Sequence, residues 1–186
     1  MPPITKLWLS IVKTRDCMDS SDFHDLLAQI LSHCSSYTNP ESNPDLPPMH
    51  AFFQSVENPG ILLMITGYPS QEINNAADKT YAATFLPRMF QVVEHKWLKQ
   101  LDLDVRLLPL GDDDLTIQFR DTPLDPGTGQ AIGGWDVWLE TEQAIRMREA
   151  GKVQDLPKVW VGIGKKAEAE LPLARDVIHI RKVKAA

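Results

Sequence analysis

Three side chains suited to proton transfer recur at intervals of seven residues, as Tyr81, Arg88 and His95. Histidine is a base near neutral pH, and tyrosine or arginine can polarise a carbonyl group or an enolate. On one continuous helix, a step of seven residues drifts by only ~20°, so the three side chains would form one stripe beside the apolar face. The spacing predicts one wall of a proton-transfer site, and a solvated border of polar groups is the alternative interpretation.

A predicted strand at 49–56 adds further candidates. His50, Phe52 and Gln54 share one face of it, because side chains alternate across a strand. His50 and Gln54 are candidate polar groups of a cavity, although a histidine beside a proline-rich loop can also simply be solvated. The predicted site therefore comprises the candidate catalytic residues His95, Tyr81 and His50 and the candidate substrate-binding residues Arg88, Phe52, Gln54 and Trp8.

Other common chemistries lack the residues that they need. There is no G-x-S-x-G segment for a serine nucleophile, and the stretch 162–166 is too short for a phosphate-binding loop and lacks its hydroxyl. Gly127 and Gly129 lie in a Pro/Gly loop where Ile132 replaces the third glycine of a dinucleotide motif, so a turn is expected. The five histidines show no metal-binding spacing; a metal site would need ligands from distant segments, and none is predicted.

The composition is that of one globular chain. Of its 186 residues, 43% are hydrophobic and 24% charged, and a chain of this size buries roughly 70% of its unfolded surface. A net charge of -6 argues against a nucleic-acid partner, and no apolar run approaches the ~20 residues that cross a bilayer. Because no signal peptide is recognisable and Cys17 and Cys34 form no C-x-x-C pair, we expect a cytoplasmic protein with reduced thiols.

The elements that must position the candidate residues alternate between strands and helices. Ser20 or Ser21 begins an amphipathic helix, Ser70 begins a second, and Thr84 with Pro87 predicts a new helix start. The order β-α-β-β-α-β is the ferredoxin-like arrangement, an α+β fold in which helices cover one face of a four-stranded antiparallel sheet. The predicted strands are 4–13, 49–56, 61–68 and 104–110, and the later helices are 71–83 and 85–100.

Residues 111–186 follow this first unit, 1–110, as a second predicted unit. They are either a degenerate second copy of the first unit or a C-terminal α+β extension of it, and no sequence repeat decides between the two. Trp135 and Trp138 are expected to pack in a core or a dimer interface. The expected elements are strands near 115–120, 135–139, 158–163 and 176–183, a loop at 121–134, and a short helix from Thr141 to Gly151.

The predicted sheet has more apolar surface than its helices can cover. Its first and third strands are apolar on both faces, whereas two helices cover only one face. The other face must meet either a second subunit or residues 111–186. We predict a homodimer on this ground.

The element order, the apolar hairpin at 49–68 and the Ala- and aromatic-rich helix that leads into 103–110 resemble the dimeric α/β-barrel superfamily. The most similar members are fungal proteins related to antibiotic-biosynthesis monooxygenases. The resemblance covers residues 4–110 and is architectural, and the segment 111–186 is absent from the shortest members. It implies a homodimer, a small-molecule substrate in a pocket between sheet and helices, and no metal or organic cofactor.

The resemblance implies three alternative functions. The favoured one is a cofactor-independent enzyme of polyketide or aromatic natural-product biosynthesis, a cyclase or isomerase in which His50, Tyr81 and His95 serve as acid and base. The second is a cofactor-independent monooxygenase that oxidises phenols to quinones, and oxygen consumption separates it from the first. The third is a non-catalytic ligand-binding barrel, whose interior would be apolar with no polar groups converging.

Overall fold

One antiparallel sheet of eight strands dominates the structure, a computed structural model that describes residues 3–124, 131–151, 158–165 and 176–183. The strand order is β4-β1-β3-β2-β8-β5-β7-β6. The strands are β1 (Ile4–Val12), β2 (His50–Ser55), β3 (Ile61–Tyr68), β4 (Val93–Leu101), β5 (Asp114–Arg120), β6 (Ile132–Trp135), β7 (Trp160–Lys165) and β8 (Asp176–Lys182). The helices of the described residues include α1 (Arg15–Met18), α2 (Ser21–Thr38), α3 (Gln71–Thr84), α4 (Leu86–Val92) and α5 (Glu142–Glu149), with the 3₁₀ turns η1 (Val105–Leu107) and η3 (Trp138–Glu140).

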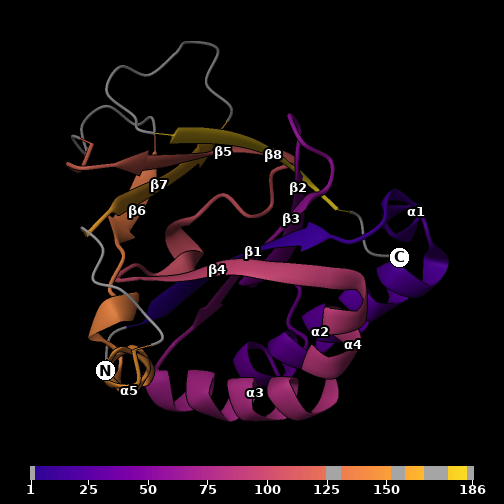
Figure 1. Ribbon diagram of the computed structural model, residues 1–186, viewed down its shortest axis with the longest axis horizontal. Coiled ribbons are helices and arrows are strands. Elements are labelled where there is room, and N and C mark those ends of the chain that lie inside the picture. Colours follow the sequence, from indigo (N-terminus) through magenta and orange to yellow (C-terminus); the bar gives the residue numbers. More distant parts are fainter. Residues whose placement is uncertain (1–2, 125–130, 152–157, 166–175, 184–186) are drawn as a thin grey trace.

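Helices α2, α3 and α4 cover one face of strands β1–β4 (Figure 1). The hydroxyls of Ser20 and Ser70 accept the amides of Phe23 and Ile73, so these serines begin α2 and α3 as predicted. The apolar side of α2 then packs against the sheet through a cluster that contains Phe23, Leu26, Leu27, Ile30, Cys34, Phe52, Leu62 and Met64.

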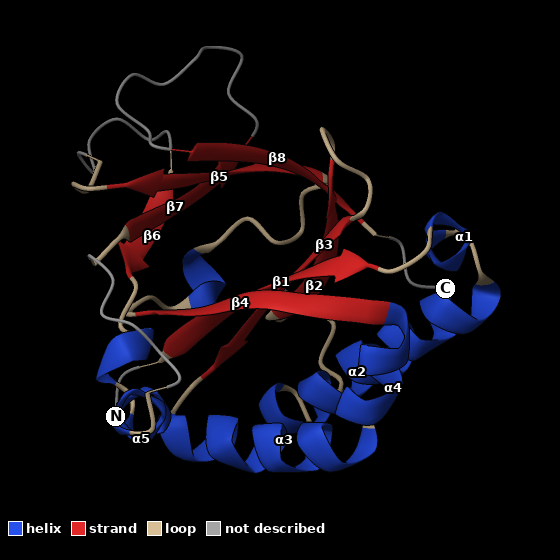
Figure 2. Ribbon diagram, in the orientation of Figure 1, coloured by secondary structure: helices blue, strands red, loops and turns tan. Residues whose placement is uncertain are grey.

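The opposite face of β1–β4 is covered by the second half of the same chain. Strands β5, β7 and β8 curl over it (Figure 2), and one apolar core joins the two halves of the sheet. The core includes Leu7, Leu9, Phe53 and Leu63 from the first half and Leu115, Ile117, Val161, Ile163 and Ile180 from the second. A second subunit is therefore not needed to cover this face, and the homodimer stays a prediction without that support.

The two edge strands of the curled sheet meet at one end. Leu101 bridges Asp136, and the amide of Val137 donates to the carbonyl of Gln100 at 2.7 Å. The Asp102 amide also donates to the Trp135 carbonyl at 3.2 Å. Within the described residues β4 and β6 pair nowhere else, so the barrel is open along the rest of β4.

The strand order of the second half repeats that of the first. Numbered within each half, both β4-β1-β3-β2 and β8-β5-β7-β6 read fourth, first, third, second. Both halves contribute to one continuous sheet, and the choice between a degenerate second copy and an extension stays a prediction. The observed architecture is thus an α+β barrel in keeping with the predicted fold class.

The predicted helix at 85–100 is wrong in its second half. Helix α4 ends at Val92, and 93–101 is strand β4, which pairs with β1. The register shifts between Leu9, opposite Trp97, and Ser10, opposite His95, which leaves Lys96 as an extra, bulged residue. The bulge breaks the alternation of apolar residues, so the sequence reads as a helix.

Two expectations for the residues on either side of this segment are also wrong. Helix α4 has no side-chain cap at its start, which contradicts the predicted cap at Thr84, while Pro87 does lie in its first turn. The strand expected at 104–110 is wrong, because β4 already supplies the fourth strand of the sheet. Those residues instead include η1, whose Val105 is buried.

In the second half, most predicted elements lie near their expected positions. Thr141 caps α5 through the Ala144 amide, and β5, β7 and β8 match the predicted strands within about two residues. The strand expected at 135–139 is displaced to β6, and η3 follows it. The turn expected at Gly127 and Gly129 lies outside the described residues. Among the described helices, none is both long and apolar enough to cross a membrane.

Candidate functional site

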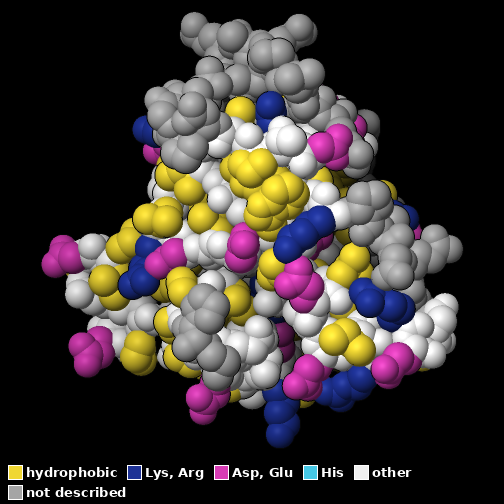
Figure 3. All heavy atoms as spheres, turned by 90° about the vertical axis from the view of Figure 1, so that its left-hand side faces the viewer, with side chains coloured by type: hydrophobic (Ala, Val, Ile, Leu, Met, Phe, Trp, Pro, Cys, Tyr) yellow, Lys and Arg dark blue, Asp and Glu magenta, His cyan; other side chains and the backbone are white. Residues whose placement is uncertain are grey.

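A groove with two lobes lies beside the open edge of β4. The aromatic lobe has a volume of about 1130 Å³ and extends from β4 to β8 and η3, and the polar lobe, of about 1040 Å³, lies between the sheet and α3. Figure 3 faces the side that carries α5 and β6, where apolar side chains gather next to charged ones. The residues that line both lobes are Trp8, Leu98, Trp138, Glu140, Gln143 and Lys158.

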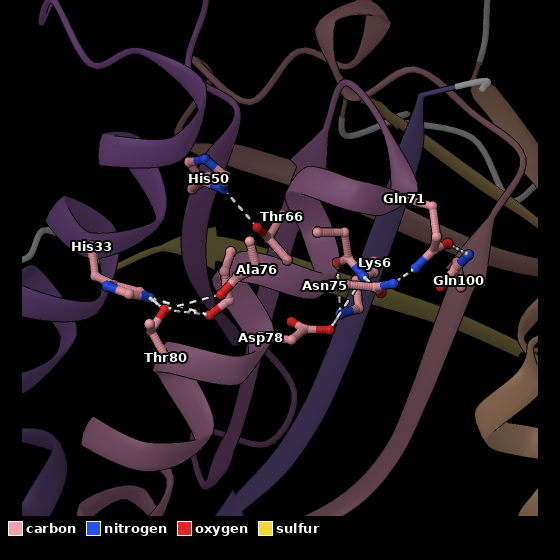
Figure 4. Close-up of polar contacts among 12 residues, drawn as sticks. Lys6, His33, His50, Thr66, Gln71, Asn75, Ala76, Asp78, Thr80 and Gln100 are labelled. Carbon is pink, nitrogen blue, oxygen red and sulfur yellow. Dashed lines mark hydrogen bonds and ion pairs between the residues drawn. The ribbon is translucent and has the colours of Figure 1, made fainter.

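The polar lobe is built around Lys6, whose side chain is only 3% exposed. Its Nζ donates to Oδ1 of Asn74 at 2.9 Å and to Oδ2 of Asp78 at 2.5 Å (Figure 4). The same Nζ lies 5.6 Å from the centre of the Trp8 ring. Burial lowers the pKa of the Lys6 ammonium, because desolvation outweighs the opposing attraction of Asp78.

The side-chain periodicities of a strand and a helix bring the groups around Lys6 together. Lys6 and Trp8 are two residues apart on β1 and share its helix-facing side, while Asn74 and Asp78 are four residues apart on α3 and share one side of that helix. Lys6 is the only charged residue of β1. The carboxylate of Asp78 on α3 therefore balances the positive charge of Lys6 across the interface between sheet and helices.

Tyr81 and a pair of glutamines complete the polar lobe. Nε2 of Gln100 donates to Oε1 of Gln71 at 3.3 Å, which joins β4 to the start of α3 (Figure 4). Within the described part of the chain, the Tyr81 hydroxyl has no hydrogen-bond partner. Burial raises the pKa of this hydroxyl well above its ordinary value, so it stays protonated and can donate a hydrogen bond to a ligand.

The aromatic lobe has flat apolar walls. Trp97 meets Phe119 edge-on, with ring centres 5.8 Å apart, and Trp8 and Trp138 complete the walls. Ion pairs border it: Lys99 with Asp136 at 2.9 Å and Lys158 with Glu140 at 2.7 Å. Such walls suit an aromatic ring, because offset and edge-on ring contacts are favourable.

His95 enters the aromatic lobe beside the bulge of β4. Its ring lies 5.0 Å from that of Trp8, and its Nδ1 is buried with no hydrogen-bond partner among the described residues. Desolvation lowers the pKa of His95 below its ordinary value of 6.5, so the imidazole is neutral at pH 7 and can accept a proton.

The structure brings three of the seven predicted site residues together around the indole of Trp8. The Tyr81 ring lies 6.1 Å from that ring and the His95 ring 5.0 Å from it, measured between ring centres. They do not form a stripe on one helix as predicted, because the chain leaves the helix before His95. Tyr81 belongs to α3 and His95 to β4.

The other four residues lie outside both lobes. Arg88, on α4, donates to Oε1 of Gln29 at 2.9 Å on the surface, and Gln54 donates to the Pro59 carbonyl at 2.7 Å in the hairpin turn. Phe52 is buried in the core under α2. His50 is 8% exposed, and its ring nitrogens contact Thr38 Oγ1 at 2.8 Å and Thr66 Oγ1 at 2.6 Å. The predicted approach of His50 to the site is therefore wrong, since hydrogen bonds hold it elsewhere.

Sequence reasoning missed the central residue of the polar lobe and one wall of the groove. The available signal for Lys6 was a lysine in a largely apolar strand, with the apolar residues Ile4 and Trp8 two positions before and after it. Trp138 was expected in a core or an interface, and it instead lines both lobes. Among the described residues, no three His, Cys, Asp or Glu side chains are grouped so that they could hold a metal ion.

Comparison with known proteins supports the fold through structural similarity at low sequence identity. No protein-family model matches the chain, and no curated protein matches its sequence. A candidate chlorite dismutase of known structure aligns with a TM-score of 0.50 and 10% identity over 100% of this chain and 96% of its own. This match supports the ferredoxin-like α+β barrel fold.

Two further structures align more weakly over nearly full length. A variant chlorite dismutase from Candidatus Nitrospira defluvii has a TM-score of 0.49 and 7% identity, covering 98% of this chain and 92% of its own. A candidate monooxygenase from Lactobacillus acidophilus has a TM-score of 0.44 and 8% identity, covering 98% and 94%. None of these comparisons supports the expected likeness to fungal proteins.

Proposed function

We propose that the protein is an enzyme that transfers protons on a small aromatic carbonyl compound, as an isomerase or a cyclase does, without a metal or organic cofactor. The observation that carries the proposal is the arrangement around Trp8. Three polar side chains lie near the same indole. The neutral imidazole of His95 lies 5.0 Å from its centre, the ring of the protonated Tyr81 6.1 Å and the desolvated Nζ of Lys6 5.6 Å.

The two lobes have different roles in such a reaction. The aromatic lobe binds the ring of the substrate against Trp8, Trp97 and Trp138. Hydrogen bonds from Tyr81 and Lys6 in the polar lobe stabilise negative charge that develops on the carbonyl oxygen. His95 accepts the proton from the carbon next to the carbonyl group and returns it to another position.

A proton-transfer assay tests the proposal without knowledge of the natural substrate. Phenylacetone and benzoylacetone are incubated with the protein in deuterium oxide, and loss of the α-proton signal is followed by NMR. We expect faster exchange than in buffer alone. His95→Gln should lower the rate by roughly 10²–10⁴, the range typical of a positioned base.

The matched control is His33→Gln, since His33 lies on α2 outside both lobes and bonds the Ala77 carbonyl at 3.3 Å. This variant should exchange like the wild type. Binding of the ketones without accelerated exchange would contradict the proposal and indicate a ligand-binding barrel. Oxygen uptake with phenols would indicate the monooxygenase instead.

A further inference from the structure

We infer that Lys6 is a nucleophilic amine that forms an imine with an aldehyde or ketone bound in the polar lobe. The inference rests on the proposed function in taking a carbonyl compound as the ligand, and it goes beyond that function by assigning a covalent step to one residue. Its basis is the placement of an amine, an acid and an open pocket at one point of the barrel.

The geometry around Lys6 is unusual for a structural lysine. Its side chain is only 3% exposed, yet it lines the lobe, and its Nζ donates to Asn74 and Asp78. By contrast, Lys79, which also lines the polar lobe from α3, is exposed. An amine removed from water is the form that proteins use for Schiff-base chemistry, because burial favours the neutral, nucleophilic state.

Asp78 supplies the proton acceptor that the reaction needs. Its Oδ2 lies 2.5 Å from the lysine nitrogen, and its side chain is 41% exposed, so it connects the amine with the solvent side of the lobe. The Asn74 amide oxygen, at 2.9 Å, holds the nitrogen in place without changing its charge. A proton can therefore pass from the ammonium to the carboxylate without a large movement of either group.

The step balances without any further reagent. Asp78 takes one proton from the Lys6 ammonium, and the freed nitrogen pair forms a bond to the carbonyl carbon while the C=O π bond breaks. A proton moves from this nitrogen to the oxygen to give a carbinolamine. Asp78 returns its proton to the hydroxyl, the C–O bond breaks, and water leaves. The products are a protonated imine on Lys6, one water molecule and the Asp78 carboxylate.

The same surroundings favour what the imine would then do. A protonated imine withdraws electrons from the neighbouring carbon more strongly than a ketone does, so the α-proton becomes more acidic. The rings of Tyr81 and His95 both lie near that of Trp8, at 6.1 and 5.0 Å between ring centres, so a compound bound beside Trp8 would have a hydroxyl donor and a neutral imidazole close to it. Asp78 remains as the counter-ion of the imine.

Reductive trapping tests the inference directly. The folded protein is treated with limiting benzaldehyde and sodium cyanoborohydride, digested, and mapped by mass spectrometry. Benzaldehyde has no α-proton, so the label reports only the amine. We expect Lys6 to be labelled at least tenfold faster than Lys79. Labelling of Lys6 should also continue at lower pH than labelling of an ordinary, exposed amine.

Variants separate the chemical role from a structural one. Lys6→Arg keeps the positive charge but cannot form an imine, so it should lose the label, whereas Lys13→Met, at an exposed position outside both lobes, should leave labelling of Lys6 unchanged. Asp78→Asn should slow labelling of Lys6 by tenfold or more while exposed lysines react as before. If Lys6→Arg does not fold, the label map of the wild-type protein still decides the question.

Two results would overturn the inference. One is labelling confined to exposed lysines, and the other is labelling of Lys6 at the same rate in folded and urea-unfolded protein. The outcome is independent of the exchange assay above. Accelerated exchange without a Lys6 adduct removes the imine and keeps the proposed function, while an adduct without exchange does the reverse.

Discussion

At the scale of single residues, burial separates two histidines that look alike in the sequence. His50 and His95 were both candidate catalytic groups. Threonine hydroxyls form hydrogen bonds with both ring nitrogens of His50, whereas Nδ1 of His95 has no partner in the part of the chain that the structure describes and its ring borders the aromatic lobe. The ring of His95 therefore borders a pocket, whereas His50 is held inside the protein and contributes to stability.

We predict an acid limb in the pH profile of α-proton exchange that belongs to His95. Desolvation lowers the pKa of this imidazole below 6.5, so the neutral base predominates at pH 7. The rate constant kcat/KM should be constant near neutral pH and fall as pH drops through a pKa below 6.5. His95→Gln should remove this limb together with most of the rate, and its thermal unfolding should change little. An unchanged acid limb in the variant would assign the base elsewhere.

A second prediction concerns His50 and stability. Burial lowers the pKa of His50 to about 4, whereas the unfolded chain keeps the ordinary value of 6.5. Between these values only the unfolded state takes up the proton, so the His50 contribution is present above pH 6.5 and is lost as pH falls toward 4. The loss amounts to about 3 kcal/mol.

Urea unfolding at several pH values measures this contribution. His50→Gln should be less stable than the wild type at pH 7 and should show a shallower loss between pH 6.5 and 4. The control is His24→Gln on α2, where the imidazole contacts the Met18 carbonyl and is partly exposed. Equal slopes in the wild type and His50→Gln would refute the prediction.

At the scale of elements, one bulge and one close approach shape the barrel. The extra residue in β4 directs His95 toward Trp8, while the residues after it resume pairing with β1. Strand β3 approaches η1 so closely that Gly67 has no room for a side chain. A Cβ there would lie 2.2 Å from Cγ1 of Val105.

We expect Gly67→Ala to destabilise the protein by about 1–3 kcal/mol, because overpacking a buried site forces neighbouring groups out of place. Denaturant unfolding measures the effect. Gly111→Ala is the matched control, since among the described residues no atom beyond its two chain neighbours lies within 4 Å of a Cβ at that position, and it should change stability by less than ~0.5 kcal/mol. Val105→Ala should offset part of the loss in the double variant. Equal stability of the two glycine variants would contradict the packing explanation.

At the scale of the whole molecule, the candidate site depends on how the two halves of the sheet meet. The groove exists because β4 and β6 join at one end and separate along the rest of β4. Asp136 holds the junction: Oδ1 accepts the amides of Gln100 at 3.2 Å and Trp138 at 3.1 Å, and Oδ2 accepts Lys99 at 2.9 Å. The junction also positions η3, which carries the shared wall residue Trp138.

Asp136→Ala should therefore lower the free energy of unfolding by about 1–3 kcal/mol and loosen the junction, since two amides and an ammonium lose their acceptor. Hydrogen exchange should show faster exchange of the Gln100 and Trp138 amides than in the wild type. Asp113→Ala, at an exposed position before β5, is the control and should leave both quantities unchanged. Unaltered protection at Gln100 in Asp136→Ala would show that the junction does not depend on this carboxylate.

Self-association is also a property of the whole molecule. Since β5, β7 and β8 cover the face for which a partner was expected, the barrel has an apolar core within one chain. The predicted homodimer can be measured by sedimentation velocity at micromolar concentration. A monomer would contradict the predicted homodimer and leave the groove intact.

The sequence by itself determined the elements whose pattern is local. Alternation in β1 and β2, helical spacing in α2, and the caps Ser20, Ser70 and Thr141 all act within a few residues, so they can be read without the fold. Tertiary structure decided the rest, because β4 is a strand only through its pairing with β1 and closes against Asp136 from the second half. Lys6 shows the reason most clearly: its partners Asn74 and Asp78 are 68 and 72 residues away, and the burial that makes an amine reactive is a property of that contact.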